Sequence, residues 1–128
     1  MKKYIPILCI FLMIQFSCSE LKSEKQQEIE KFQSEMKRIN DSSAYYFDKG
    51  IKLLKAGVDP TEIGAKISSK LTYYRTEINK KSMEFRISSK KLGIPQAEYD
   101  SIFRELMKSY QANVDKYKYL AKNGVKLN

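Results

Sequence analysis

Few residues of this chain belong to the types that perform acid–base, nucleophilic or metal chemistry. The 128 residues include no histidine and two cysteines, Cys9 and Cys18. A lack of histidine removes the commonest general base and the commonest zinc ligand. The sequence also contains no Gly-rich phosphate loop and no calcium-loop pattern. We therefore expect a protein that is not an enzyme and that binds no metal.

One catalytic pattern does occur in the sequence. Ser88 and Lys91 have the S-x-x-K spacing, in which a lysine one helical turn away activates a serine nucleophile. The companion motifs of such enzymes are missing, and a chain rich in serine and lysine meets this spacing by chance. A hydrolase that uses Ser88 and Lys91 is therefore only a third hypothesis, behind the two non-enzymatic functions described below.

Basic residues interspersed with tyrosines are a second group with chemical potential. The formal net charge of the chain is +9, and residues 18–128 carry 22 basic and 15 acidic side chains, a net of +7. This balance favours anionic partners. Aromatic side chains beside cations are typical of surfaces that stack bases or sugars next to phosphates or sulfates. The segment 60–92 carries most of the charge, and its candidate binding face consists of Lys66, Lys70, Tyr73, Arg75 and Lys80. A solvated, lysine-rich surface without a ligand is the alternative.

The first residues are typical of an export signal. Lys2 and Lys3 precede an apolar run from Tyr4 to Phe16. This run of about 13 residues is shorter than the roughly 20 residues that a membrane-spanning helix needs. We therefore predict a signal peptide over residues 1–17 that is removed on export.

The residues after this run, Ser17-Cys18-Ser19, resemble the cleavage site of bacterial lipoprotein precursors, in which signal peptidase II cuts before a cysteine. Ser17 and Cys18 match that pattern, whereas Gln15 and Phe16 depart from its usual residues. The resemblance implies a covalent lipid on Cys18 and anchoring in the bacterial cell envelope, in the outer membrane or at the cell surface. An ordinary signal peptide cut after Ser19 is the alternative. Export in turn disfavours nucleic acid as a partner.

The rest of the sequence predicts three long helices. Apolar residues recur at steps of three and four over about 23–56, 60–92 and 95–123, which is the spacing of one face of a helix. Helices of this length joined by short turns form an all-α, up-down-up antiparallel three-helix bundle over 23–124, with long coiled-coil-like helices. A short tether, residues 18–22, precedes the bundle, and residues 125–128 are expected to form a frayed tail.

Capping residues support these limits. Ser23 with Gln26 forms a capping box at the first helix, and Asp59-Pro60 begins the second. The polar stretch 40–43 competes for backbone hydrogen bonds, but we expect the first helix to continue through it. Each helix is followed by a glycine suited to a left-handed C-terminal turn: Gly57, Gly93 and Gly124.

Folding the predicted helices about their turns aligns apolar residues in layers. Polar residues fall on or near this seam at Ser43, Lys81 and Ser88. A partner helix, from a second copy or from an envelope complex, would repair such defects, so a structural or assembly role is the alternative to ligand binding. The predicted layers are Phe32 with Phe85 and Phe103, Ile39 with Ile78 and Tyr110, and Tyr46 with Leu71 and Tyr117.

The same topology brings the start of the first helix and the turn after the second helix to one end. Lys22, Lys25, Lys90 and Lys91 would form a membrane-facing basic cluster there, beside the lipid on Cys18. A lysine near an anionic membrane surface contributes about 1 kcal/mol, whereas lysines at helix ends can also simply be solvated. The sequence thus predicts a lipid-anchored, non-enzymatic envelope protein whose basic helical surface binds an anionic polymer or another protein.

Overall fold

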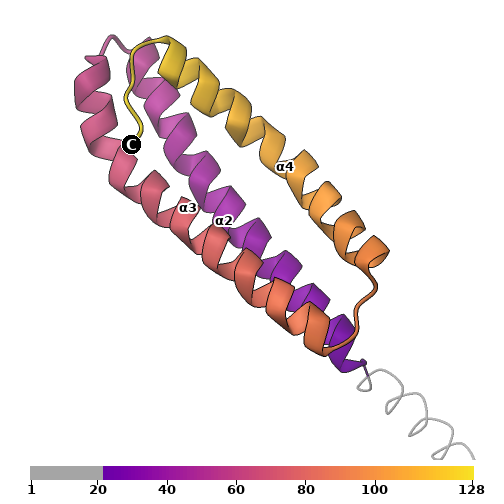
Figure 1. Cartoon of the computed structure of the whole chain (residues 1–128). Coiled ribbons are helices and arrows are strands. Elements are labelled where there is room, and N and C mark those ends of the chain that lie inside the picture. The colour runs from indigo at the N-terminus through magenta and orange to yellow at the C-terminus, as the bar shows by residue number, and fades with distance from the viewer. Residues whose placement is uncertain (1–21) are drawn as a thin grey trace, which may run out of the picture.

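The computed structural model describes residues 22–128. The predicted signal peptide, Cys18 and residues 19–21 of the tether lie outside the described residues. The described chain forms three helices, α2 (Glu24–Lys55), α3 (Pro60–Lys91) and α4 (Gln96–Lys122), which run up, down and up (Figure 1). The prediction of an all-α three-helix bundle is confirmed. Within residues 22–128, no helix combines the length and the apolar character needed to cross a membrane.

Two of the helices begin at the residues that the sequence indicated. The Ser23 hydroxyl accepts a hydrogen bond from the backbone N–H of Gln26 at 3.2 Å. Oδ1 of Asp59 accepts from the N–H of Thr61 at 2.9 Å, and Pro60 occupies the first turn of α3. These bonds satisfy backbone donors that a helix start otherwise leaves unpaired. The helix α2 continues without a break through residues 40–43, as expected.

All three helices end in the same turn. Gly57, Gly93 and Gly124 have φ values of 82°, 67° and 86°, which L side chains rarely adopt. After each glycine, the N–H of the next residue bonds back to the carbonyl five positions earlier, as Val125 does to Leu120 at 3.0 Å. This is the Schellman arrangement, in which an apolar residue after the glycine folds back onto the helix. The turn redirects the chain at the end of every helix.

The core has two centres, one toward each end of the bundle. At the α2 start, the Phe32 ring stacks on Phe85 at 4.1 Å between centroids and packs against Phe103 at 5.5 Å. This confirms the first predicted layer. The second centre lies at the other end and consists of Phe47, Ile63, Ile67, Leu120 and Val125.

The middle of the bundle differs from the predicted layers. The helix α2 packs along both α3 and α4, whereas α3 and α4 diverge from each other (Figure 1). Ile39 is fully buried. Ile78 and Tyr110 line a groove and do not form the predicted layer with Ile39. The third predicted layer is wrong because Tyr117 is 45% exposed and the Tyr46 ring packs against Tyr74, at 5.9 Å.

The C-terminal residues are not a frayed tail. Val125 is 2% exposed and belongs to the second core centre, which Leu127 also contacts. The hydroxyl of Thr72 on α3 donates to the carbonyl of Asn128 at 2.6 Å. Residues 125–128 therefore run back along α3. At this end they lie where the sequence register predicted direct contact between α3 and α4.

Polar residues on the seam find partners inside the chain. The Ser43 hydroxyl donates to the carbonyl of Ile39 at 2.9 Å, and Ser88 donates to Glu28 on α2 at 2.8 Å. Lys81 forms ion pairs with Glu84 at 3.3 Å and Glu35 at 3.5 Å; these partners raise the pKa of Lys81, Glu84 most strongly. These residues therefore need no partner helix to satisfy their polar groups.

Candidate functional site

The five residues of the predicted binding face do not share one face. Successive helix positions differ by about 100°, which places Lys66, Lys70, Tyr73 and Lys80 within about 80° of one another around α3. Arg75 lies about 140° or more from each of them and lines the groove between α3 and α4. The structure therefore keeps four of the predicted residues together and assigns the fifth to a different site.

A row of tyrosines accompanies the four residues. Tyr73 packs edge-on against Tyr74 at 5.3 Å between centroids, and Tyr74 contacts Tyr46 of α2 at 5.9 Å. Tyr46 in turn packs edge-on against Tyr45 at 5.1 Å. The outer members, Tyr45 and Tyr73, are 63% and 56% exposed. The row bridges the two helices and presents an aromatic ring to solvent at each end.

Charge on this surface is mixed: it carries three lysines and two glutamates, Glu62 and Glu77, and Glu77 lies about 20° from Lys66 around α3. Lys66 pairs with Glu62, one turn earlier, at 2.8 Å, so part of its charge is neutralised. Within residues 22–128, Lys70 and Lys80 form no ion pair. We call the set of Tyr45, Tyr46, Tyr73, Tyr74, Lys66, Lys70 and Lys80 the tyrosine–lysine face.

The sequence reasoning missed Tyr45. A usable signal was present, because Tyr45-Tyr46 and Tyr73-Tyr74 are both adjacent pairs. They fall nearly opposite each other when the first two helices fold about the intervening turn. Two such pairs across a hairpin can form one continuous aromatic surface.

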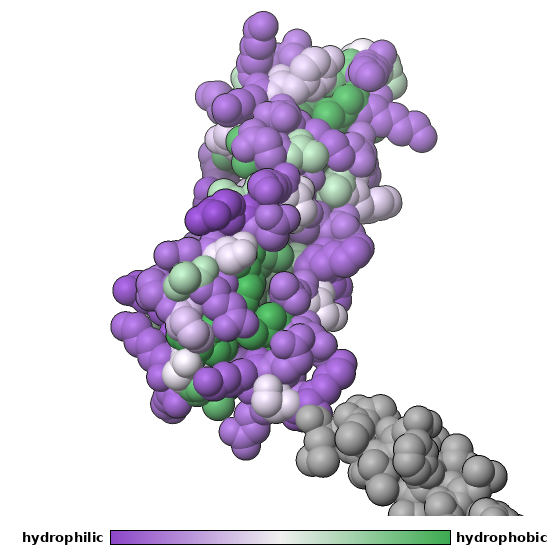
Figure 2. All heavy atoms as spheres, turned by 90° about the vertical axis from the view of Figure 1, so that its right-hand side faces the viewer, coloured by the Kyte–Doolittle hydropathy of each residue, from purple (hydrophilic) through white to green (hydrophobic). Residues whose placement is uncertain are grey.

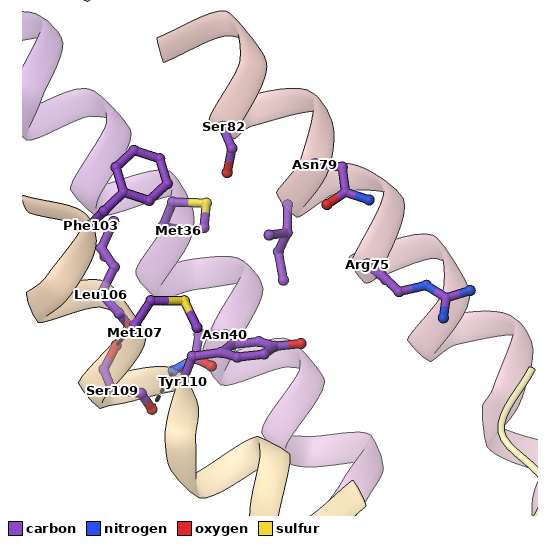
Figure 3. Close-up of a pocket in the computed structure, with 11 residues that line it drawn as sticks. Met36, Asn40, Arg75, Asn79, Ser82, Phe103, Leu106, Met107, Ser109 and Tyr110 are labelled. Carbon is purple, nitrogen blue, oxygen red and sulfur yellow. Dashed lines mark hydrogen bonds between the residues drawn. The ribbon is translucent and has the colours of Figure 1, made fainter. Parts of the chain in front are cut away.

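The second candidate site is the groove between α3 and α4, with α2 as its floor. It consists of two adjoining hollows of about 200 and 220 Å³, which share Arg75 and Tyr110. In Figure 3, Arg75, Asn79 and Ser82 extend from α3, while Leu106, Met107 and Tyr110 extend from α4 on the other side. Apolar atoms also reach the surface between hydrophilic side chains on the face that Figure 2 shows.

Fixed hydrogen bonds hold the groove floor to α4. Nδ2 of Asn113 donates to the carbonyl and to Oδ1 of Asn40, at 3.0 and 2.7 Å. Asn40 Nδ2 donates to the carbonyl of Ser109 at 3.3 Å. Burial raises the pKa of Tyr110 above its usual value, and the nearby Arg75 charge acts in the opposite sense. The phenol is therefore neutral at physiological pH and can donate a hydrogen bond.

One of the four lysines of the predicted basic cluster is already neutralised by an ion pair. Lys22 pairs with Glu30 at 2.8 Å, and hydrogen bonds from Lys22 and Gln26 lower the pKa of that carboxyl. Lys25, Lys90 and Lys91 are exposed. The start of α2 and the end of α3 do meet at one end of the bundle (Figure 1), so the structure brings the helix ends that carry these lysines together.

The Ser88 hydroxyl forms hydrogen bonds with groups other than Lys91. Ser88 bonds to Glu28 on the neighbouring helix, with the carbonyl of Glu84 a further acceptor at 3.0 Å. Lys91 is exposed at the last turn of α3. No hydrogen bond joins these two residues in the described part of the chain, and neither lines one of the two groove hollows.

Residues 22–128 contain no group of three or more histidine, cysteine or carboxylate side chains placed to hold a metal ion. Compared with protein-family models, with curated protein sequences and with solved structures, the chain matches none.

Proposed function

We propose that the chain is a lipid-anchored, non-enzymatic protein of the bacterial cell envelope, in the outer membrane or at the cell surface, whose bundle binds an anionic polymer through the tyrosine–lysine face. The observation that carries the binding function is the row of four tyrosines across α2 and α3, with exposed rings at both ends and lysines beside it. The lipid anchor rests on the residues around Cys18.

An acidic polysaccharide suits this surface better than an uncharged one. Tyrosine rings stack on the apolar faces of sugars, while Lys70 and Lys80 attract carboxylate or sulfate groups. The lysines are exposed, so their attraction is screened over a distance of about 8 Å at physiological ionic strength. Binding should therefore weaken as salt is added, with a remainder that depends on the rings.

The test of this face uses heparin as the anionic probe and dextran as the uncharged one. We expect Tyr73→Ala and Lys70→Glu each to weaken heparin binding by about tenfold, a loss typical of a central contact. The matched controls are Tyr119→Ala, which removes an exposed tyrosine from α4, and Lys118→Glu, which reverses an exposed charge on the same helix. Equal losses in the four variants would mean that heparin binding depends only on overall charge and aromatic content, and would contradict the proposal for this face.

The lipid anchor is tested separately. Cells that express the chain should incorporate labelled palmitate into it, and Cys18→Ala should abolish the label. Protease treatment of sealed cells then separates the cell surface from the interior of the envelope, because a surface domain is removed while the cells stay intact. A label that persists in Cys18→Ala would contradict lipidation at this cysteine.

The assembly hypothesis was based on polar seam residues without partners, but these residues form hydrogen bonds and ion pairs within the chain. Self-association remains a prediction that the mass of the purified chain in solution tests.

A further inference from the structure

We propose that the groove between α3 and α4 is the docking site for an amphipathic helix of an acidic partner protein, with its apolar face in the groove and a carboxylate against Arg75. This site lies on the side of α3 away from the tyrosine–lysine face, and the inference does not depend on the function proposed for that face.

The groove has the dimensions of a helix. Its two hollows share Arg75 and Tyr110, and its wall on α4 extends from Phe103 to Tyr117, where Leu127 and Asn128 also line the second hollow. At 1.5 Å per residue this is about 21 Å, the length of an incoming helix of about 14 residues. Two antiparallel helices over a third leave the vacant position of a four-helix bundle, and a groove between helices is a common receptor for an amphipathic helix.

The groove surface is apolar and adaptable. Met36 on the floor and Met107 on the rim contribute flexible side chains, and Met107 is 57% exposed. Methionine is favoured at docking surfaces because it adjusts its shape to the side chain that it meets. Ile78 and Leu106 are only partly buried and also line the groove. A partner that placed leucines three, four and seven residues apart would cover these four side chains.

Charge identifies the partner as acidic. Arg75 lies midway along the groove, where both hollows meet, and it forms no ion pair within residues 22–128. A carboxylate facing it could accept two parallel hydrogen bonds from the guanidinium. The Tyr110 phenol, which lines both hollows, offers a further donor. A second copy of the chain is disfavoured, because two bodies that each carry a net charge of +7 over residues 18–128 repel each other.

A single-chain anionic lipid would share part of this chemistry, with a carboxylate at Arg75 and an alkyl tail in the groove. The rim argues for a helix, because Asn79 and Ser82 stand at the edge, where the polar flank of an amphipathic helix lies. Small-molecule sites enclose most of their ligand, whereas the lining of this groove includes side chains that are largely exposed, such as Met107.

The experiment uses the full chain in phosphatidylcholine nanodiscs and a labelled 15-residue helical peptide with leucines on one face and one central glutamate beside them. We expect binding that Arg75→Glu and Met107→Lys each weaken by about tenfold or more, as is typical of contacts in the centre of an interface. Two matched variants should bind as the unchanged chain does. Lys80→Glu reverses a charge on another face of α3, and Met83→Lys replaces a methionine that is 66% exposed and does not line the groove.

A charge exchange makes the test sharper. A peptide with lysine in place of the glutamate should bind the unchanged chain weakly and the Arg75→Glu chain at least about tenfold better, because specificity here rests on complementary charge. Circular dichroism of every variant checks that the bundle is retained.

Several results would overturn the proposal. Peptide binding that is absent, or equal for the groove and control variants, would exclude docking here. The groove would be assigned to a lipid if palmitate bound in a way that depends on Arg75 and displaced the peptide, while the lysine peptide did not bind the Arg75→Glu chain better than the unchanged chain. A doubled mass in solution that Met107→Lys abolishes would assign it to a second copy. Variants of Lys70 and Tyr73 should leave peptide binding unchanged, so failure here and failure of the proposed function are distinguishable.

Discussion

The side-chain amide of Asn113 is buried between α2 and α4, where the residue is 2% exposed. Its two bonds to Asn40 are the polar link in the middle of the bundle, between the two apolar core centres. Asn113 is buried and Asn40 is half-buried, so loss of either amide leaves polar groups of the other with only part of their hydration to replace the bond.

We therefore expect Asn113→Ala to lower the free energy of unfolding by about 1–3 kcal/mol. Urea denaturation measures the loss, and Gln111→Ala, an exposed change two positions away, should remain within about 0.5 kcal/mol of the unchanged chain. In a double-mutant cycle, Asn40→Ala together with Asn113→Ala should cost less than the sum of the single changes. Additive losses would show that the two amides do not act as a pair.

The helix α3 and the C-terminal tail approach each other so closely that one glycine separates them. A Cβ atom at Gly64 would lie 2.7 Å from the carbonyl oxygen of Lys126. Backbone atoms cannot turn aside as a flexible side chain can. Gly64 is therefore the position at which the packing of residues 125–128 can be tested by a single methyl group.

The effect of Gly64→Ala on the free energy of unfolding should change sign when residues 125–128 are removed. In an ordinary helix interior, alanine is more stable than glycine by about 1 kcal/mol, but in the full chain we expect a loss of about 1–3 kcal/mol from overpacking. After deletion of residues 125–128, the same substitution should stabilise. Gly50→Ala is the control, because its Cβ would meet the side chains of Ile67 and Leu120, which the deletion retains. A stabilising Gly64→Ala in the full chain would contradict the packed tail.

The helices and their limits could be predicted from sequence because their determinants are local. A capping side chain, a proline in the first turn and a glycine followed by an apolar residue act within a few positions. The phenylalanine layer was also predictable, since large rings at equal distances from each turn must meet. Gly124-Val125 repeats the pattern of Gly57-Val58 and Gly93-Ile94, so the same signal could have identified the packed tail.

The groove and the separate position of Arg75 could not be predicted in this way. The register of three helices assumes that every pair closes equally, and nothing in that register provides space for a tail between two of them. In the structure Val125 and Leu127 occupy one end, and in the middle α4 packs along α2 and diverges from α3 (Figure 1). Grouping Arg75 with Tyr73 by nearness in sequence fails for a simpler reason, because two positions along a helix lie about 200° apart.

The bundle is a rod with different ends. The start of α2 and the end of α3 form one end, while the Gly57 turn and the end of α4 form the other (Figure 1). A lipid on Cys18 would hold the first end at the membrane. Because Lys22 is already paired with Glu30, contact with anionic headgroups at this end would then fall mainly to Lys25, Lys90 and Lys91.

Binding of the full chain with Cys18→Ala to phosphatidylglycerol vesicles tests whether this end faces the membrane. Two lysines contribute about 2 kcal/mol at such a surface, so Lys90→Glu with Lys91→Glu should weaken binding by roughly 30-fold or more. Lys55→Glu with Lys122→Glu makes the same change in net charge at the opposite end, where both residues are exposed, and should cost much less. Salt should reduce the difference, because screening shortens the reach of exposed charges. Equal losses at the two ends would mean that the membrane senses only the net charge of the molecule, and the lysines near Cys18 would then have no part in orienting it.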